Sequence, residues 1–302
     1  MRIASLVPHA TELLFALGAG GDVLGVTHEC DHPPEVSELE RLTRDVLPPG
    51  LSAREIDEAV RERTLNGEAI YELDRLALAD LDPELIVTQA LCPVCAVSYE
   101  EVQEIAGTLP SSPTVVALDP KTLGETLADV RTLGEATGRE REARELVESA
   151  AARTDAVREA VRGAERPRVV AVEWLEPVFV AGHWTPQLIE LAGGEDVLGL
   201  PGEPSQELDW ETLGAAAPEV VVVMPCGYDA PRAYEEGLAH SDRLAGLGAV
   251  RVVAVDAAAY FSRPGPRLID GLELLAHILH PERVPTVPEV AVALELELTV
   301  PG

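Results

Sequence analysis

Positive charge is scarce in this sequence. The chain has 23 lysine and arginine residues against 53 aspartate and glutamate residues, so its net charge at pH 7 is −30. A surface with this excess of carboxylates repels the phosphates of nucleic acids and of anionic lipids. We therefore exclude nucleic acid and anionic membranes as binding partners.

Long apolar segments are also missing. No run of 18 or more apolar residues occurs, so the sequence predicts no membrane-spanning helix. Residues 1–8 lead directly into an expected strand, without the charged and apolar segments of a secretory signal or the cysteine of a lipid anchor. From these features we predict a cytoplasmic protein, and we expect it to be a monomer.

Cysteine and aromatic side chains are few. The 302 residues include four cysteines, and aromatic residues make up 4% of the chain. In a reducing compartment the cysteines are expected to be thiols or metal ligands, which excludes structural disulfides. With 46% hydrophobic and 25% charged residues, the composition is still that of a folded globular protein.

A long amphipathic helix is predicted near the middle of the chain. From Arg139 to Gly163 apolar residues recur at the spacing of one helix face, and no proline or glycine interrupts them before Gly163. A shorter run with the same period covers residues 123–133 and stops near Gly138. We interpret the long helix as a spine between two halves; the alternative is a crossover helix inside one large domain.

Strands and helices alternate on both sides of this spine. Buried strands are expected at Ile3–Val7 before it and at Arg168–Val172 after it, in the pattern of parallel sheets covered on both faces. We therefore predict an α/β fold of two Rossmann-like α/β lobes, joined by one long backbone helix, with a ligand cleft between the lobes. The expected parts are an N-terminal lobe (1–121), a helical spine (122–164), a C-terminal lobe (165–281) and a tail (282–302).

Five segments then carry a family resemblance. They are Ser5–Leu13, Gly25–Pro34, Leu81–Val87, Gly193–Leu198 and Ser262–Arg267. In this order, around the long helix, they resemble the helical-backbone (class III) periplasmic binding proteins, in particular the vitamin B12-binding branch. The resemblance covers residues 1–281 and implies a binding protein that encloses a large ligand, a corrinoid such as cobalamin.

The expected ligand contacts follow the predicted strands, where open α/β sheets bind ligands. They are Pro8, His9, Thr11, His28, Glu29, Gln89, Trp174, Trp184, Tyr228, Tyr260, Phe261 and Arg263. Flat aromatic rings suit the face of a corrin, and Arg263 could donate to amide or carboxylate oxygens of the ligand. Core packing explains any single aromatic residue equally well, and an ion pair explains Arg263.

The four cysteines also fall on these loops. Cys92 and Cys95 have the spacing at which one loop supplies two thiolates to a metal, and Cys30 and Cys226 lie on other expected cleft loops. A shared site would suit zinc or an iron–sulfur cluster. The alternatives are a site made by the C-x-x-C pair alone and four unrelated thiols, and His28 or His32 could join such a site or be turn residues.

Two other functions stay open. One is a metal or iron–sulfur protein with redox or enzymatic activity, and the other is a transporter-associated binding protein for a metal chelate. Glu173 and Glu176, on either side of Trp174, could act as an acid/base pair. No Ser/His/Asp order, phosphate-binding glycine-rich loop or H-E-x-x-H segment occurs, so we favour a binding protein over an enzyme.

Overall fold

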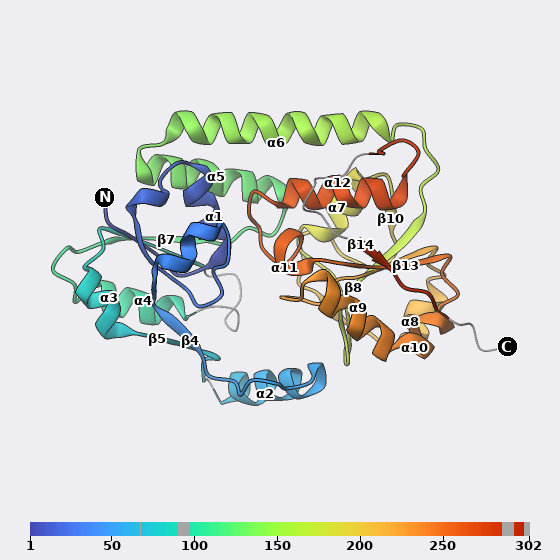
Figure 1. Ribbon diagram of the computed structural model, residues 1–302, viewed down its shortest axis with the longest axis horizontal. Coiled ribbons are helices and arrows are strands. Elements are labelled where there is room, and N and C mark those ends of the chain that lie inside the picture. Colours follow the sequence, from blue (N-terminus) through green and yellow to red (C-terminus); the bar gives the residue numbers. More distant parts are fainter. Residues whose placement is uncertain (67, 90–96, 286–292, 299–302) are drawn as a thin grey trace. The chain divides into compact units, whose positions relative to one another are not determined.

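The computed structural model describes residues 1–66, 68–89, 97–285 and 293–298. The chain forms two compact units, coloured from blue to green and from green to red in Figure 1. Unit 1 consists of residues 1–120 and 124–148, and unit 2 of residues 121–123 and 149–302. Within the described residues, no helix has the length and apolar character needed to cross a membrane.

Unit 1 contains a five-stranded parallel sheet with the order β3-β2-β1-β6-β7. Its strands are β1 (Ile3–Ser5), β2 (Val23–Val26), β3 (Glu40–Arg41), β6 (Leu85–Gln89) and β7 (Thr114–Leu118). A separate antiparallel pair joins β4 (Thr43–Asp45) to β5 (Tyr71–Leu73). The helices are α1 (Pro8–Ala16), η1 (Gly20–Asp22), η2 (Pro34–Glu38), α2 (Ala53–Leu65), α3 (Arg75–Leu81), α4 (Tyr99–Ala106), α5 (Leu123–Thr137) and the first part of α6 (Glu140–Ala160).

Successive side chains of the central strand β1 enter two different apolar clusters, so the core of unit 1 has two parts. In β1, Ile3 packs with Leu13 and Leu14 of α1, whereas the next residue, Ala4, packs in a second cluster. Successive side chains of a strand point to opposite faces, so a sheet covered on both sides needs apolar residues at every position. The expected strand Ile3–Val7 meets this condition except at Ser5, and the strand ends there because Pro8 begins α1.

Unit 2 contains a seven-stranded mixed sheet, with the path β11-β9-β8-β12-β13-β14 and β10 beside β8. Its strands are β8 (Arg168–Leu175), β9 (Val178–Val180), β10 (Glu195–Asp196), β11 (Gln206–Glu207), β12 (Val220–Val223), β13 (Arg251–Val255) and β14 (Ala293–Glu295). Its helices are the second part of α6, α7 (Thr185–Leu191), α8 (Trp210–Ala215), α9 (Ala230–Ala239), α10 (Ser241–Gly246), α11 (Ala257–Tyr260) and α12 (Leu268–Leu279). β8, β12 and β13 are parallel and make the centre of the sheet.

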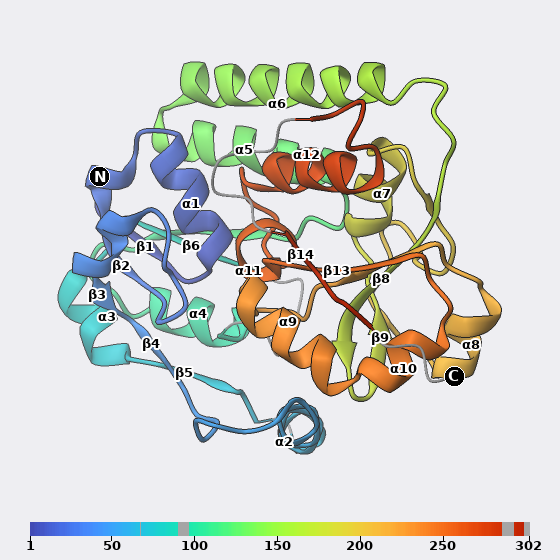
Figure 2. The same ribbon diagram turned by 45° about the vertical axis from the view of Figure 1, so that its right-hand side comes forward.

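Three segments differ from the sequence-based expectations. The sequence pattern over residues 70–79 predicts one helix, but the segment forms β5 followed by α3, because Asp74 caps α3 by accepting from the backbone N–H groups of Leu76 and Ala77. β8 continues past Val172 and forms a hairpin with β9, so Trp174 lies in a strand and not in a loop. The expected tail contributes β14, which pairs antiparallel with β13 as Figure 2 shows.

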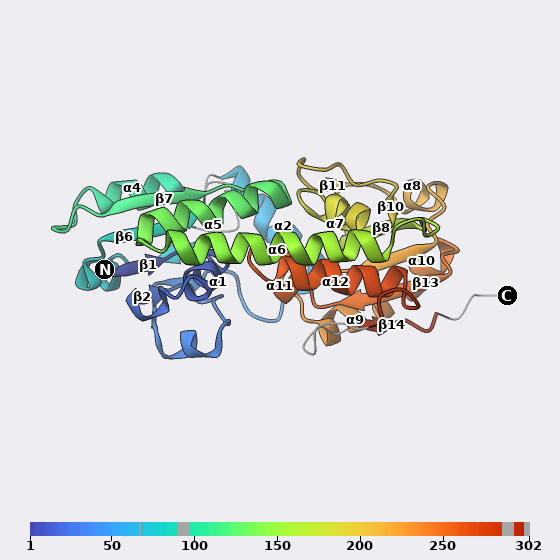
Figure 3. The ribbon, with the colours of Figure 1, turned by 90° about the horizontal axis from the view of Figure 1, so that it is seen from above.

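The helix expected from Arg139 is present as α6, seen lengthwise in Figure 3. Gly138, at φ +69°, ends α5, and the Arg139 N–H then donates to Gly134 O at 2.7 Å, as in a Schellman motif. The buried face of α6 consists of Ala143, Val147, Ala150 and Val157. The long amphipathic helix is therefore confirmed, and the boundary between the two units falls inside it.

In unit 2, α6 is also held by ion pairs. The guanidinium of Arg153 donates to both carboxylate oxygens of Glu273 at 2.7 Å and to Asp270, both on α12. These carboxylates raise the pKa of Arg153 above its usual range, chiefly through the hydrogen bonds from Glu273. A bidentate ion pair is directional, and this one is partly screened from water. It therefore fixes how α6 lies against α12, in addition to the apolar contacts of α6.

Val147→Pro should destabilise the protein by about 3 kcal/mol or more, because proline removes a helix hydrogen bond and clashes with the preceding turn. Val147 is only 8% exposed in the core of unit 1, so the helix cannot relax there without losing contacts. Urea unfolding followed by circular dichroism measures the change, with the exposed neighbour Glu148→Ala as control. Equal unfolding midpoints for Val147→Pro and the wild type would show that the stability of the protein does not require α6 to be one continuous helix.

Candidate functional site

In unit 1, the loop after β2 is held by side chains of β4 and β5. His28 Nδ1 lies 2.7 Å from Thr43 Oγ1, and the His28 backbone N–H donates to the same oxygen at 3.1 Å. The His28 ring meets the ring of Tyr71 edge-on, with 4.9 Å between centroids. The Tyr71 hydroxyl donates to Glu29 Oε1 at 2.9 Å. Two expected site residues, His28 and Glu29, therefore belong to one polar cluster.

A small pocket lies beside this cluster. Its lining residues are Leu6, Pro8, Thr27, His28, Glu29, Thr43, Tyr71 and Val97. Its volume of about 10 Å³ has room for roughly one water molecule, so it can receive a single group of a ligand but not a whole corrin. The pocket brings together three expected site residues, Pro8, His28 and Glu29.

Sequence reasoning missed Thr43 and Tyr71, which complete this pocket. Neither residue lies in a segment that carries a ligand-binding motif. The only signal that could have found them is their position in two short alternating runs, which pair as β4 and β5 and reach the loop after β2. Pairing between separated runs of three residues is not visible in the sequence pattern.

Thr11 and Cys30 lie inside unit 1. Thr11 is fully buried and its hydroxyl donates to Ser5 Oγ at 2.8 Å. Cys30 is 2% exposed, packs in the apolar core of the unit and has its Sγ 3.1 Å from Thr11 Oγ1 and 3.2 Å from Thr27 Oγ1. Both residues therefore tie the loop after β2 to α1, and a ligand contact of Thr11 stays a prediction.

The remaining expected residues of unit 1 are close to the same strand ends. His9 is the second residue of α1 and is 2% exposed. Gln89 is the last residue of β6 and is 7% exposed. Pro8, which starts α1, is buried as well. A contact between His9 or Gln89 and a ligand stays a prediction.

In unit 2, hydrogen bonds join the segments at the carboxyl ends of β8, β12 and β13. The Cys226 N–H donates to Glu173 O at 3.1 Å, and the Ala258 N–H donates to Tyr228 O at 3.0 Å. The Gly227 N–H donates to Ser262 Oγ at 3.2 Å. Three segments that carry expected ligand contacts are thus neighbours in the fold.

Trp174 and Tyr228 are the aromatic centre of these segments. Their rings meet edge-on with 5.6 Å between centroids, and the Arg232 guanidinium lies 3.6 Å from the centroid of the Tyr228 ring. Trp174 is partly buried, and its indole N–H has no hydrogen-bond partner among the described residues. A buried indole N–H normally finds an acceptor, so this buried group is left unsatisfied in the described part of the chain.

Three of the expected aromatic contacts are core residues instead. Phe261 is 2% exposed, and its carbonyl accepts a hydrogen bond from the buried indole N–H of Trp184 at 2.7 Å. Tyr260, at 3% exposed, ends α11. These rings are buried in the described structure, as is that of Tyr228 at 4% exposed, and a ligand contact for them stays a prediction. Arg263, in the next turn, is partly exposed.

The shared metal site of four cysteines has no support in the described part of the chain. Cys92 and Cys95 lie outside the described residues. Cys30 is a buried core residue of unit 1, and Cys226 is an exposed residue of unit 2. In the described ranges no three His, Cys, Asp or Glu side chains are grouped as metal ligands. A shared site requires all four cysteines to lie in the cleft, whereas Cys30 is packed in the apolar core of unit 1.

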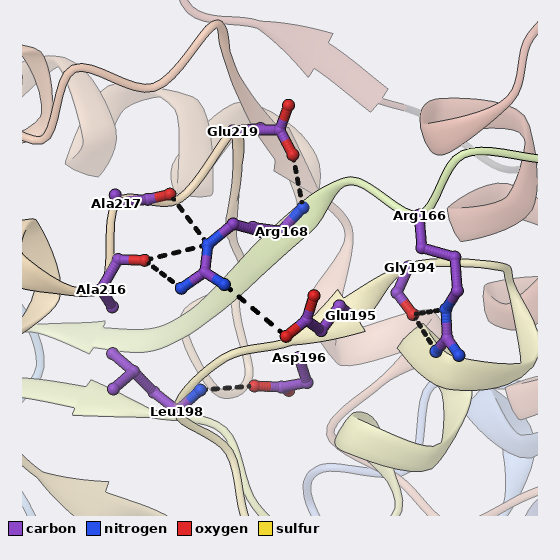
Figure 4. Close-up of polar contacts among 9 residues, drawn as sticks. All are labelled: Arg166, Arg168, Gly194, Glu195, Asp196, Leu198, Ala216, Ala217 and Glu219. Carbon is purple, nitrogen blue, oxygen red and sulfur yellow. Dashed lines mark hydrogen bonds and ion pairs between the residues drawn. The ribbon is translucent and has the colours of Figure 1, made fainter.

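The segment Gly193–Leu198, which carried part of the family resemblance, has a structural role at the other end of β8. Figure 4 shows Arg168, the first residue of β8, donating to Ala216 O at 2.6 Å and facing the Glu195 carboxylate at 3.6 Å. Arg166 donates to Gly194 O, and Asp196 Oδ1 accepts from the Leu198 N–H at 3.0 Å. These contacts fasten β10 to the start of β8.

Glu173 is the titratable group with the most unusual surroundings in unit 2. Burial raises the pKa of its carboxyl to about 7, although a hydrogen bond from Ser205 opposes this shift. Glu176, in contrast, lies 3.6 Å from both His240 Nε2 and an Arg243 nitrogen. The two carboxyls have separate partners, so an acid/base pair around Trp174 gains no support.

Because the pKa of Glu173 is higher in the folded than in the unfolded chain, its ionisation opposes folding as the pH rises from about 4.5 to about 7. The free energy of unfolding of the wild type should fall over this range by about 1–3 kcal/mol relative to that of Glu173→Gln. Urea titrations at several pH values measure the difference. The exposed Glu211→Gln variant should follow the wild type, and parallel profiles for wild type and Glu173→Gln would refute the assignment.

Comparison with known proteins gives a consistent family. A family model described as periplasmic binding protein matches residues 3–255. The vitamin B12-binding protein of Vibrio cholerae is 24% identical over 276 residues, which cover 90% of this chain and 86% of that protein. The uncharacterized ABC transporter substrate-binding lipoprotein YvrC of Bacillus subtilis is 23% identical over 298 residues, which cover 93% and 80%.

Solved structures share the fold over nearly the whole chain. A periplasmic heme-binding protein from Pseudomonas aeruginosa superposes with a TM-score of 0.69 at 19% identity, covering 98% of this chain and 96% of that one. The periplasmic vitamin B12-binding protein of Vibrio cholerae gives 0.66 at 21% identity, covering 92% and 96%. The two-lobe α/β architecture expected from the sequence is confirmed, and at these identities the likeness concerns the fold and not the ligand.

The predicted cytoplasmic location is wrong. The matching family model is that of periplasmic binding proteins, and the two similar solved structures are of periplasmic proteins. The prediction was drawn from the first eight residues, and neither the folds of the units nor their charge distinguishes one aqueous compartment from another. The premise that the cysteines lie in a reducing environment falls with it.

Proposed function

Since the chain belongs to the periplasmic binding protein family, we propose that it binds a corrinoid, cobalamin or a close relative, and hands it to an ABC permease. The vitamin B12-binding protein of Vibrio cholerae and the transporter-associated lipoprotein of Bacillus subtilis, each matched over at least 90% of this chain, support the two parts of this proposal. The expected ligand contacts lie in both units, and the cleft between the lobes that they would share stays a prediction.

The aromatic pair Trp174–Tyr228 is the observation that carries the proposal. A corrin offers a large, flat apolar face and a rim of amide groups. An indole ring held at its edge by Tyr228 can cover part of such a face, while its unused N–H can donate to a rim amide oxygen. The Arg232 guanidinium against the outer face of Tyr228 adds a cation–π contact that fixes the pair.

A haem is the second candidate. It is also flat and apolar, and the heme-binding protein of Pseudomonas aeruginosa has this fold over 98% of the present chain. Its two propionates are a less favourable match to a chain with a net charge of −30. A corrinoid, whose rim amides are neutral, avoids this repulsion.

Trp174→Ala should weaken corrinoid binding about 10-fold to 100-fold, which corresponds to roughly 1–3 kcal/mol for a buried aromatic contact. Isothermal titration with cyanocobalamin, and with hemin in parallel, measures the affinity. Trp210→Ala is the matched control, because Trp210 packs on the same core cluster from α8, under Arg243. Tight binding of hemin but not of cyanocobalamin would replace the first candidate by the second.

Equal losses of affinity in Trp174→Ala and Trp210→Ala would count against the proposed contact, because they would reflect a general loss of packing. So would an unchanged affinity of Trp174→Ala together with a lower melting temperature. In either case Trp174 would be a core residue like Trp184, whose indole N–H is already bonded to Phe261 O.

A further inference from the structure

We propose that His28 binds the central metal of the corrinoid through Nε2, at an axial position that the ligand leaves open. The inference rests on the proposed function and adds to it a metal–protein bond and a selectivity among corrinoids. It is carried by the way in which unit 1 holds the His28 ring.

The first step is the orientation of the imidazole. In the tautomer that donates from Nδ1, the proton points to Thr43 Oγ1 at 2.7 Å, and this oxygen also accepts the His28 backbone N–H at 3.1 Å. A hydroxyl oxygen has two lone pairs, so it can accept both. The lone pair of the ring is then on Nε2. Metal-binding histidines are characteristically held in this manner, through the nitrogen that does not bind the metal.

The second step is the availability of Nε2. His28 is partly exposed, and its Nε2 makes no hydrogen bond to any residue that the structure describes. The edge contact with Tyr71, itself bonded to Glu29, restricts rotation of the ring. The site thus offers an oriented nitrogen ligand with a carboxylate close by, which suits a cationic metal complex.

The third step concerns the chemistry of the ligand. A cobalt(III) corrinoid such as diaquacobinamide carries water at its axial positions. The Nε2 lone pair forms a bond to cobalt as one bound water leaves, and the oxidation state does not change. In cyanocobalamin both axial positions are already occupied, by cyanide and by the ligand's own base. The wild type should therefore prefer diaquacobinamide to cyanocobalamin.

The ratio of the two affinities tests this selectivity. His28→Ala should lower the affinity for diaquacobinamide about 100-fold and leave that for cyanocobalamin nearly unchanged. Thr43→Val, which keeps the imidazole but removes its anchor, should lower the diaquacobinamide affinity about 10-fold, as expected of a positioning residue. His32→Ala, an exposed histidine further along the same loop, is the control and should match the wild type.

The metal–nitrogen bond itself has a spectroscopic signature that does not depend on a variant. Reduced cobalt(II) cobinamide bound to the wild type should show a triplet splitting of its electron paramagnetic resonance lines, from one axial ¹⁴N nucleus. In protein labelled with ¹⁵N-histidine the triplets should become doublets. His28→Ala should lack the splitting and Thr43→Val should retain it, whereas loss of structure alone would abolish binding in both.

The outcomes separate the inference from the function on which it rests. If the wild type binds diaquacobinamide without nitrogen splitting, or if the splitting persists in His28→Ala, the inference is overturned and the proposed function stands. If the wild type binds neither corrinoid, the proposed function falls and takes the inference with it. Splitting in the wild type that changes with histidine labelling and disappears in His28→Ala supports both.

Discussion

The apolar stripe of α6 is the constraint on which the arrangement of the chain depends. Ala143 and Val147 are buried in the core of unit 1, and one turn later Ala150 and Val157 are buried as part of unit 2. Between residues 148 and 149 the chain therefore passes from unit 1 to unit 2 inside a helix. An interruption of the helix would expose buried side chains in both units, whereas most two-domain proteins place their boundary in a flexible linker that can change without such a loss.

Scarcity of positive charge shapes the interior of both units. Several arginines are used in the framework: Arg153 joins α6 to α12, and Arg168 fastens the start of β8. Some carboxyls remain without a cationic partner. Burial, reinforced by the negative charges of Asp119 and Glu125, raises the pKa of Asp129 to about 7, and burial does the same for Glu173. These groups make the stability of the folded chain sensitive to pH near neutrality.

The proposed binding residues are presented by a firm scaffold. In unit 1 the loop after β2 is bonded to β4 and packed against β5, and in unit 2 the segments after β12 and β13 are bonded to each other. Residues held by several contacts lose little conformational freedom when a ligand binds, so more of the interaction energy appears as affinity. The same contacts fix the His28 imidazole and the Trp174–Tyr228 pair in definite orientations.

Much of the architecture was predictable from the sequence, because it depends on local patterns. The spacing of apolar residues in α6, the capping box of Ser52 and Glu55 and the all-apolar run of β12 each determine an element by contacts within or near themselves. The order of these elements, together with five weak motifs, was enough to predict the two-lobe α/β fold. Glu173 and Trp174 were expected in a loop because the pattern of β8 weakens there, and only pairing with β9 extends the strand.

The sequence by itself determined the fold, the long helix and the loops that carry polar and aromatic residues. Only the tertiary structure decided which of those residues are buried. Cys30, Trp184 and Phe261 look like loop residues in the chain but are buried by segments distant in sequence. Conversely, Thr43 and Tyr71 acquire a role because two short strands pair beside His28. Burial and cross-chain pairing depend on contacts between separated segments, and a local pattern contains no information about them.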